Sequence, residues 1–199
     1  MIEAKYKLII ASSNKGKIHE FQKILPDFKC IPQSILNISN VEETGKSFEE
    51  NAILKAKNAF KKTNISSIGD DSGLIVPAIN NEPGLHSARY AGLNATDSDN
   101  RNKLISKLRN KKLESTYAYF FCCIVAIGIK NQNKIIVCDG KVEGEVKTIE
   151  RGEKGFGYDP MFYPNGYSES FAELSSLEKN KISHRGQALK KLMYKLNKT

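Results

Sequence analysis

Short apolar runs alternate with amphipathic stretches along this chain, a pattern that predicts both strands and helices. Lys7–Ala11 and Phe28–Pro32 are mostly apolar and short enough to be buried strands. Between them, residues 18–25 place apolar side chains at helical spacing until Pro26 ends the run. The first third of the chain therefore predicts a strand, a polar turn, a helix and a second strand.

A second helix is predicted after Ser47. Ser47 and Glu50 have the spacing of a capping box. The apolar stripe that follows consists of Phe48, Ala52, Ala56, Ala59 and Phe60. A polar stripe of Asn51, Lys55 and Asn58 runs beside it. This stripe borders the buried face and could line a cleft, although periodicity alone favours a solvated face.

The rest of the chain predicts further strands and helices. We expect strands at Ser66–Asp70 and Leu74–Ile79 around an Asp-Asp-Ser-Gly turn, a strand at Tyr117–Ile129, and strands at Ile135–Val137 and Val142–Ile149 that turn at Asp139-Gly140. We expect helices at Asp97–Leu108 and Ala172–Leu177, and a final helix capped by Ser183. Elements that are mixed but not strictly alternating favour a mixed α/β sheet in one domain spanning residues 1–199.

Composition and length are those of a soluble globular protein. Of the 199 residues, 40% are hydrophobic and 27% are charged. No run approaches the roughly 18–20 apolar residues that a membrane span needs. The apolar residues near the start, Leu8-Ile9-Ile10, are too few for a signal-peptide core. We therefore expect a cytoplasmic protein with no membrane partner.

The four cysteines agree with a reducing compartment. Cys30, Cys122, Cys123 and Cys138 all stand in apolar contexts. The adjacent pair is not a Cys-x-x-Cys motif, and no second pair completes a zinc site. Buried, reduced thiols are the favoured interpretation.

The net charge of +9 has two interpretations. A basic surface could bind nucleic acid. Lysines are, however, spread from end to end, and no aromatic residues interleave with Lys111-Lys112 or Lys190-Lys191. A general surface bias is therefore favoured and no nucleic acid is expected, while a phosphorylated small molecule would also benefit from the positive field.

Two acidic pairs are the strongest chemical signal. Asp70-Asp71 lies between Gly69 and an apolar run, and Glu42-Glu43 precedes the second helix. Mg²⁺ prefers oxygen ligands and commonly takes one or two carboxylates plus substrate phosphates. One carboxylate from each pair could hold such an ion. Lys55 or the bound metal would then keep the carboxylate ionised and able to accept a proton from water.

Two further segments suit an anionic substrate. Residues Ser12 to Lys17 form a polar turn between a strand and a helix start, where backbone N–H groups and the helix dipole favour anions. The turn is not a Walker A loop, because it lacks that spacing of glycines. His184-Arg185 stands at the predicted start of the last helix and suits an anion or a polar ring.

Seven motifs in order carry a resemblance to a known family. They are Ser12-Ser13-Asn14-Lys15-Gly16-Lys17, Glu42-Glu43-Thr44-Gly45, Phe48-Glu49-Glu50-Asn51-Ala52 with Lys55-Ala56, Asp70-Asp71-Ser72-Gly73-Leu74, Pro83-Gly84 with Ser87-Ala88-Arg89-Tyr90, Phe156-Gly157-Tyr158-Asp159-Pro160 and Ser183-His184-Arg185-Gly186. The set resembles the inosine triphosphate pyrophosphatase family, and the resemblance covers about Leu8 to Leu192. Those enzymes hydrolyse ITP, dITP and XTP to the monophosphate and pyrophosphate with Mg²⁺.

The resemblance implies a fold and a role for particular residues. It implies an α/β fold with an elongated, mixed central sheet flanked by helices, in two lobes with an active-site cleft between them, and commonly a homodimer. Asp71 resembles the metal-binding and proton-accepting carboxylate, Glu42 the metal-binding glutamate and Lys55 the phosphate-contacting catalytic lysine. The implied substrate contacts are Ser12, Ser13, Asn14, Lys15, Gly16, Lys17 and Ser72, with a base pocket of Phe156, Gly157, Tyr158, Asp159, Lys179, His184 and Arg185.

The base pocket has a chemical rationale. Hypoxanthine and xanthine carry a carbonyl at position 6, where adenine carries an amino group. Donors on Arg185 and Lys179 would pair with the carbonyl, whereas an unmatched buried polar group costs on the order of 1–3 kcal/mol. The rejection of GTP is not explained by these residues. Pro77 departs from the family pattern, and because proline lacks a ladder donor, its strand should be locally an edge strand or end early.

Two other functions remain open at this point. One is a nucleotide- or RNA-binding protein without turnover, which would use the basic surface and the aromatic residues Phe156 or Tyr158. The acidic pairs argue against it, because carboxylates repel phosphate unless a metal intervenes. The other is a pyrophosphatase whose main substrate is a different modified nucleotide.

Overall fold

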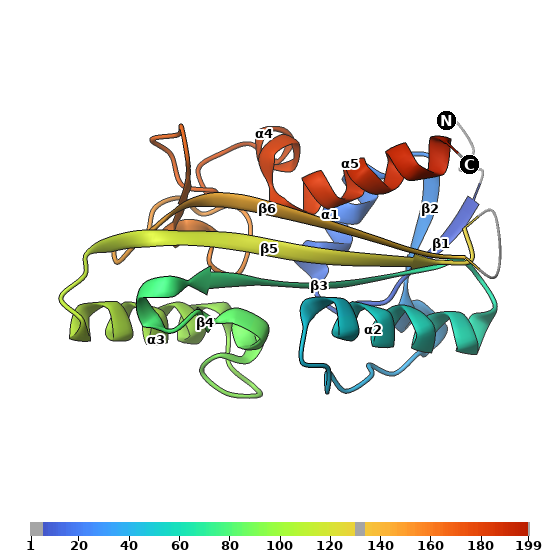
Figure 1. Cartoon of the computed structure of the whole chain (residues 1–199), viewed down its shortest axis with the longest axis horizontal. Coiled ribbons are helices and arrows are strands. Elements are labelled where there is room, and N and C mark those ends of the chain that lie inside the picture. The colour runs from blue at the N-terminus through green and yellow to red at the C-terminus, as the bar shows by residue number, and fades with distance from the viewer. Residues whose placement is uncertain (1–5, 130–133, 199) are drawn as a thin grey trace. The chain divides into compact units, whose positions relative to one another are not determined.

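The computed structural model describes residues 6–129 and 134–198, which form an α/β fold (Figure 1). The strands are β1 Tyr6–Ile10, β2 Phe28–Pro32, β3 Ser67–Val76, β4 Glu82–Pro83, β5 Ser115–Ile127, β6 Ile135–Lys147 and β7 Phe162–Pro164. The α-helices are α1 Lys15–Ile24, α2 Phe48–Thr63, α3 Asp97–Asn110, α4 Ser176–Ile182 and α5 His184–Asn197. Short 3₁₀ segments occupy Gln33–Leu36, Pro77–Ile79, Gly84–Arg89 and Asp159–Met161.

The strands form one mixed sheet. Its order is β2-β1-β3-β5-β6-β7, with β4 paired to β3. β1 runs parallel to both β2 and β3, whereas β3 with β4 and β6 with β7 are antiparallel pairs. The predicted mixed α/β class is therefore confirmed.

The chain divides into two compact units. Unit 1 comprises residues 1–71, 122–140 and 185–199, and unit 2 comprises residues 72–121 and 141–184. The long strands β3, β5 and β6 each contribute residues to both units. Each unit has its own hydrophobic core.

The core of unit 1 is built on both faces of β1. Leu8 and Ile10 belong to a cluster that includes residues of α1 and α5, whereas Ile9 belongs to another cluster with Ala59 of α2. Successive residues of a strand point to opposite faces, so a strand covered on both sides is apolar at every position. Figure 1 accordingly shows α1 and α5 on one face of this part of the sheet and α2 on the other.

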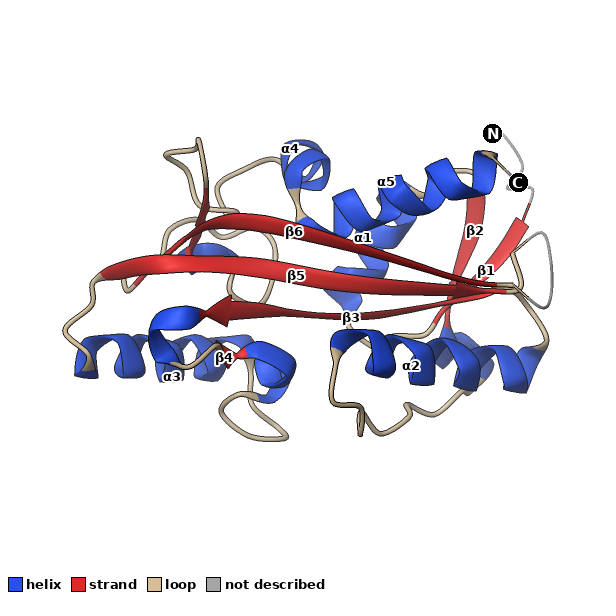
Figure 2. Ribbon diagram, viewed as in Figure 1, coloured by secondary structure: helices blue, strands red, loops and turns tan. Residues whose placement is uncertain are grey.

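The core of unit 2 is aromatic. The Phe120 and Phe162 rings pack edge to face with centroids 4.8 Å apart, and Phe171 lies 5.0 Å from Phe162. Leu104 and Leu108 of α3 are fully buried in the same cluster. Figure 2 shows how much of this unit consists of loop, so this core must also anchor irregular segments.

Three predicted elements were wrong. Residues 70–73 do not turn but continue β3, a strand of ten residues that lies between β1 and β5 in the sheet. Asp139-Gly140 likewise lies inside the continuous strand β6. The short helix expected at 172–177 begins instead at Ser176, where Ser175 and Glu178 form a capping box.

The early end of β3 and the free cysteines agree with expectation. β3 ends at Val76, directly before Pro77. Cys122, Cys123 and Cys138 are buried free thiols, and Cys30 is free and half-buried. No helix within the described part of the chain has the length and apolar character needed to cross a membrane.

We predict that Gly69→Ala destabilises the protein, because α2 packs very closely on β3 at this point. A Cβ on residue 69 would lie 2.2 Å from the carbonyl oxygen of Ala52 and 2.8 Å from the backbone nitrogen of Ala56. Overpacking of this kind costs about 1–3 kcal/mol or more. The midpoint of urea unfolding should fall, whereas Lys57→Ala at an exposed position of α2 should leave it unchanged. An unchanged midpoint for Gly69→Ala would contradict the close packing.

Candidate active site

The two adjacent carboxylates of β3 have different surroundings. Asp70 and Asp71 are both buried, at 1% and 4% exposure. Because consecutive strand residues point to opposite faces, each carboxylate contacts its own set of residues in unit 1. The pair is thus not a shared acidic cluster in a turn but two distinct sites on one strand.

Asp70 is the centre of a buried ionic network. Its Oδ2 accepts hydrogen bonds from Arg185 Nε at 2.9 Å and from Cys122 Sγ at 2.9 Å. Lys17 Nζ donates to its other oxygen, and Arg185 NH1 also binds Glu20. Burial would raise the pKa of Asp70, but the charges of Arg185 and Lys17 hold that pKa well below its usual value. Asp70 is therefore firmly ionised.

Asp71 is held by residues of α2. Asn51 Nδ2 donates to its Oδ2 at 3.0 Å, and Lys55 Nζ donates to its Oδ1 at 2.9 Å. Lys55 also binds Glu43 Oε1 at 2.7 Å. The polar stripe on the predicted helix therefore borders a group of charged residues and is not merely solvated.

Burial affects the pKa of Asp71 more than the neighbouring charges do. It raises the pKa of Asp71 above the usual value, although Lys55 and Lys17 oppose the shift. The pKa of Lys55 is also raised, because the charges of Asp71 and Glu43 outweigh its burial. Neighbouring carboxylates whose pKa values are moved in opposite directions are suited to different roles. Asp71 therefore takes up a proton more readily than Asp70 does.

The predicted phosphate loop is a well-formed helix start. Asn14 caps α1, and its side chain accepts a hydrogen bond from Lys17 N at 2.9 Å. Ser12 accepts from Asn14 N at 3.1 Å, and Ser13 accepts from Asn40 at 3.2 Å. Lys15 is exposed and Gly16 is half-buried. The N-terminal end of α1 and Lys17 therefore both belong to the same unit as Asp71.

The acidic pair before α2 is divided. Glu43 is half-buried and bound to Lys55, whereas Glu42 is exposed. Within residues 6–129 and 134–198, no three side chains of His, Cys, Asp and Glu converge as a metal site. Mg²⁺ is commonly bound through one or two carboxylates plus substrate phosphates, so Asp71 with one glutamate is a fitting donor set.

A second group of predicted site residues lies in unit 2, around Asp159. Lys179 Nζ donates to Asp159 Oδ2 at 2.6 Å, and both side chains are buried. The same oxygen accepts from Phe156 N at 2.8 Å. The Lys179 ammonium lies 4.8 Å from the Phe156 ring centroid, a cation–π distance. The base-pocket residues Phe156, Asp159 and Lys179 are therefore in contact.

The remaining predicted residues are distributed between the units. Tyr158, a predicted base-pocket residue, is only 3% exposed, and its hydroxyl donates to Ser87 O at 2.9 Å inside the core. His184 stacks on Phe120 with centroids 4.8 Å apart. Ser72 is half-buried in unit 2. Arg185 is 1% exposed and belongs to unit 1, where it binds Asp70 and Glu20.

Sequence reasoning missed several residues of these networks. Glu20 and Cys122 looked like ordinary helix and strand residues, and only the fold brings them to Arg185 and Asp70. The one available signal was the spacing of Lys17 and Glu20, which are three residues apart on the same face of a helix. Asn51 was noted in the polar stripe, but its contact with Asp71 could not be inferred.

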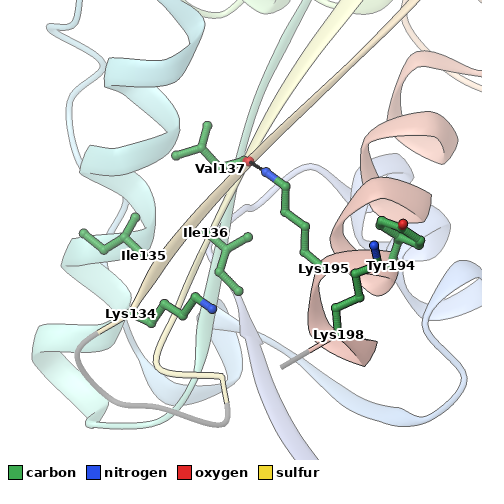
Figure 3. A pocket seen from close by; sticks show the side chains of 7 residues that line it. All are labelled: Lys134, Ile135, Ile136, Val137, Tyr194, Lys195 and Lys198. Carbon is green, nitrogen blue, oxygen red and sulfur yellow. Dashed lines mark hydrogen bonds between the residues drawn. The ribbon is translucent and has the colours of Figure 1, made fainter.

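A cavity of about 300 Å³ lies elsewhere in unit 1. It is lined by Lys134, Ile135, Ile136, Val137, Tyr194, Lys195 and Lys198 (Figure 3). Lys195 Nζ spans it to donate to Val137 O at 2.8 Å. None of the predicted site residues lines this cavity.

Known proteins resemble the chain over nearly its whole length. The sequence profile of the Ham1 family matches residues 8–195. A dITP/XTP pyrophosphatase of Legionella pneumophila (strain Lens) is 46% identical over 186 residues, covering 94% of this chain and 96% of that protein. The corresponding protein of Haemophilus influenzae is 44% identical over 194 residues, covering 96% of this chain and 100% of the relative.

Solved structures agree. The HAM1 protein from Coxiella burnetii superposes with a TM-score of 0.85 at 42% identity, covering 98% of this chain and 100% of that one. The Staphylococcus aureus Ham1 protein superposes with a TM-score of 0.82 at 45% identity, covering 96% and 98%. These matches confirm the resemblance drawn from the seven motifs. The chain belongs to the Ham1 family.

Proposed function

We propose that this protein is a Mg²⁺-dependent pyrophosphatase that hydrolyses ITP, dITP and XTP to the nucleoside monophosphate and pyrophosphate. The observation that carries the proposal is the pair of buried β3 carboxylates with separate partners, Asp70 bound to Arg185 and Asp71 bound to Asn51 and Lys55 of α2. Relatives more than 40% identical to this chain are named dITP/XTP pyrophosphatases, which supports dITP and XTP as substrates.

In the proposed reaction, Asp71 is the proton acceptor. Water attacks phosphorus, pyrophosphate leaves, and the proton from water passes to the Asp71 carboxylate. Asn51 and Lys55 orient that carboxylate through hydrogen bonds of 3.0 and 2.9 Å. Phosphoryl chemistry of this kind needs charge neutralisation and positioning more than covalent help from the protein. The Lys55 ammonium is suited to both tasks.

The metal would be held by Asp71 together with a carboxylate of the Glu42-Glu43 pair. A bound Mg²⁺ would supply charge neutralisation of the phosphate oxygens and a more acidic water. Glu42 is the ligand that the family resemblance implies, whereas Glu43 already contacts Lys55. Substrate oxygens would complete the coordination.

The proposed substrate contacts are the residues that the family resemblance implies. The loop Ser12–Lys17 offers the backbone N–H groups of a helix start for the phosphates. Phe156 offers a ring for stacking, and Lys179 and His184 offer donors for the base carbonyl. Ser72 is a further proposed substrate contact.

The expected form of the enzyme is a cytoplasmic homodimer. Sedimentation velocity would test whether it is a dimer.

Pyrophosphate release from a nucleotide panel tests the function. With Mg²⁺ present, ITP, dITP and XTP should be hydrolysed with far higher catalytic efficiency than ATP or GTP, and removal of the metal with EDTA should abolish the activity. A modified pyrimidine triphosphate as the best substrate would assign a different substrate class. Salt-sensitive RNA binding without pyrophosphate release would instead indicate a binding protein.

Asp71→Asn should keep the fold and lose nearly all hydrolysis, because an amide cannot accept the proton from water. Removing a general base costs typically a factor of 10²–10⁴ in rate. The exposed residue Asp27 provides the matched control, since Asp27→Asn changes the same atoms in the same unit. A folded Asp71→Asn protein with near wild-type turnover would remove Asp71 from the mechanism.

The two glutamates can be separated by Mg²⁺ titration. Substitution of a ligand by Gln should raise the Mg²⁺ concentration needed for half-maximal rate, and excess Mg²⁺ should restore turnover. We expect this of Glu42→Gln, whereas Glu43→Gln should lower the rate at all Mg²⁺ concentrations because it releases Lys55. If the two variants exchange these behaviours, Glu43 is the ligand.

Arg185→Ala should destabilise the protein and lower the hydrolysis of ITP and ATP by similar factors. Its guanidinium binds Asp70 and Glu20, and removing one partner of a buried ion pair costs about 3–5 kcal/mol. Arg185→Lys keeps the charge and serves where the alanine variant does not fold. If the ITP-to-ATP efficiency ratio narrows in a folded variant, Arg185 reads the base, as the family resemblance implies.

A further inference from the structure

We propose that Asp97 and Arg101 of α3 are positioning residues that hold Gly157 and thereby set the Phe156 ring for the base. The inference rests on the proposed function, because it gives that loop a selective role. All of the residues involved lie in unit 2.

Gly157 is bound on both of its backbone polar groups. Its N–H donates to Asp97 Oδ2 at 2.7 Å, and its carbonyl oxygen accepts from Arg101 NH1 at 3.0 Å. The N–H belongs to the peptide that links Phe156 to Gly157, and the carbonyl belongs to the next peptide. Two charged side chains thus fix the peptide planes on both sides of this residue. We call this arrangement the Gly157 clamp.

The loop needs such a constraint because of its glycines. Gly155 and Gly157 have φ values of +79° and +61°, in the left-handed region that favours glycine. A Cβ on Gly155 would lie 2.1 Å from Asp159 Oδ2, so this glycine allows the loop to close around the Asp159 carboxylate. Asp159 holds Phe156 N from inside the loop. Without Asp97 and Arg101, Gly157, which follows Phe156 in the chain, would lose both of its hydrogen bonds to side chains.

The helix that supplies the clamp is itself fixed. Asp97 and Arg101 are four residues apart and therefore share one face of α3. On the core side, Leu104 and Leu108 are fully buried. Asn100, which is 2% exposed, accepts from Ala91 N at 2.7 Å and donates to Ala88 O at 3.2 Å.

Of the two clamp residues, Arg101 has a second charged partner, whereas Asp97 is exposed at the start of α3. Thr96 and Asp99 form a capping box that defines where α3 begins, directly before Asp97. Arg101 Nε lies 3.0 Å from Glu150 Oε1, and its side chain is 17% exposed. Side chains restrained in this way can hold a partner without a large loss of rotamer freedom. The start of α3 and the Arg101 side chain are therefore restrained next to the glycine-rich loop.

A pre-positioned ring favours binding of the matched base. A loop that must be ordered during binding weakens affinity, and a mobile ring can also adjust to a mismatched base, which reduces discrimination between bases. We therefore expect loss of the clamp to raise the KM for ITP, with a smaller change in kcat, and to narrow the ITP-to-ATP efficiency ratio. A merely structural role would not produce this pattern.

The first measurement needs no substrate. Amide hydrogen exchange at Gly157 should accelerate at least tenfold in Asp97→Ala, and the exchange of Phe156 should follow. Asp97→Asn keeps an oxygen acceptor and should remain close to wild type. Arg109→Ala removes an exposed arginine of the same helix and is the matched control for Arg101→Ala.

The second measurement is kinetic. Asp97→Ala and Arg101→Ala should raise the KM for ITP about two- to tenfold, because part of the binding free energy must then order the loop. The proposal is overturned if exchange at Gly157 is unchanged, or if kcat falls while KM and the ITP-to-ATP ratio stay constant. Failure of the wild-type protein to hydrolyse ITP would refute the proposed function, and the exchange measurement would still decide whether the clamp exists.

Discussion

The buried charge of Asp70 is the constraint on which unit 1 depends. A carboxylate removed from water is costly unless it is paired and hydrogen-bonded. Here Arg185 and Lys17 are the two cationic partners of Asp70, and Glu20 forms a second ion pair with Arg185. Lys17 and Glu20 belong to α1, Asp70 to β3 and Arg185 to α5. The network therefore fixes these three elements relative to one another, because moving any one of them would leave a buried charge without its partner.

This constraint determines the state of the neighbouring residue. Asp70 is paired with its cations on one face of β3. The Asp71 side chain points to the other face, where its hydrogen-bond partners come from α2. Burial then raises the pKa of Asp71 more than Lys55 and Lys17 lower it. One strand thus presents a carboxylate fixed as an anion beside a carboxylate able to take up a proton, a division that a flexible acidic turn would not maintain.

In unit 2, a buried ion pair likewise constrains a loop. The buried pair of Lys179 and Asp159 is satisfied by an additional bond from Phe156 N. Because that bond ties the backbone of the loop to an ion pair, the Phe156 ring is placed by charge as well as by packing. The Gly157 clamp of Asp97 and Arg101 adds two charged contacts to the adjacent peptides.

The sequence by itself determined the local structure of this protein and the identity of its chemical groups. Apolar spacing and capping residues located α1, α2 and α3, and the ordered motifs indicated the family. Only the tertiary structure decided that residues 70–73 remain extended within a central strand, because strand pairing overrides local turn preference. It also decided that Arg185 meets Asp70 and Glu20, and that Asp97 meets Gly157. These partners are separated by 60 residues or more, and no local pattern encodes which buried charge will be neutralised by which distant one.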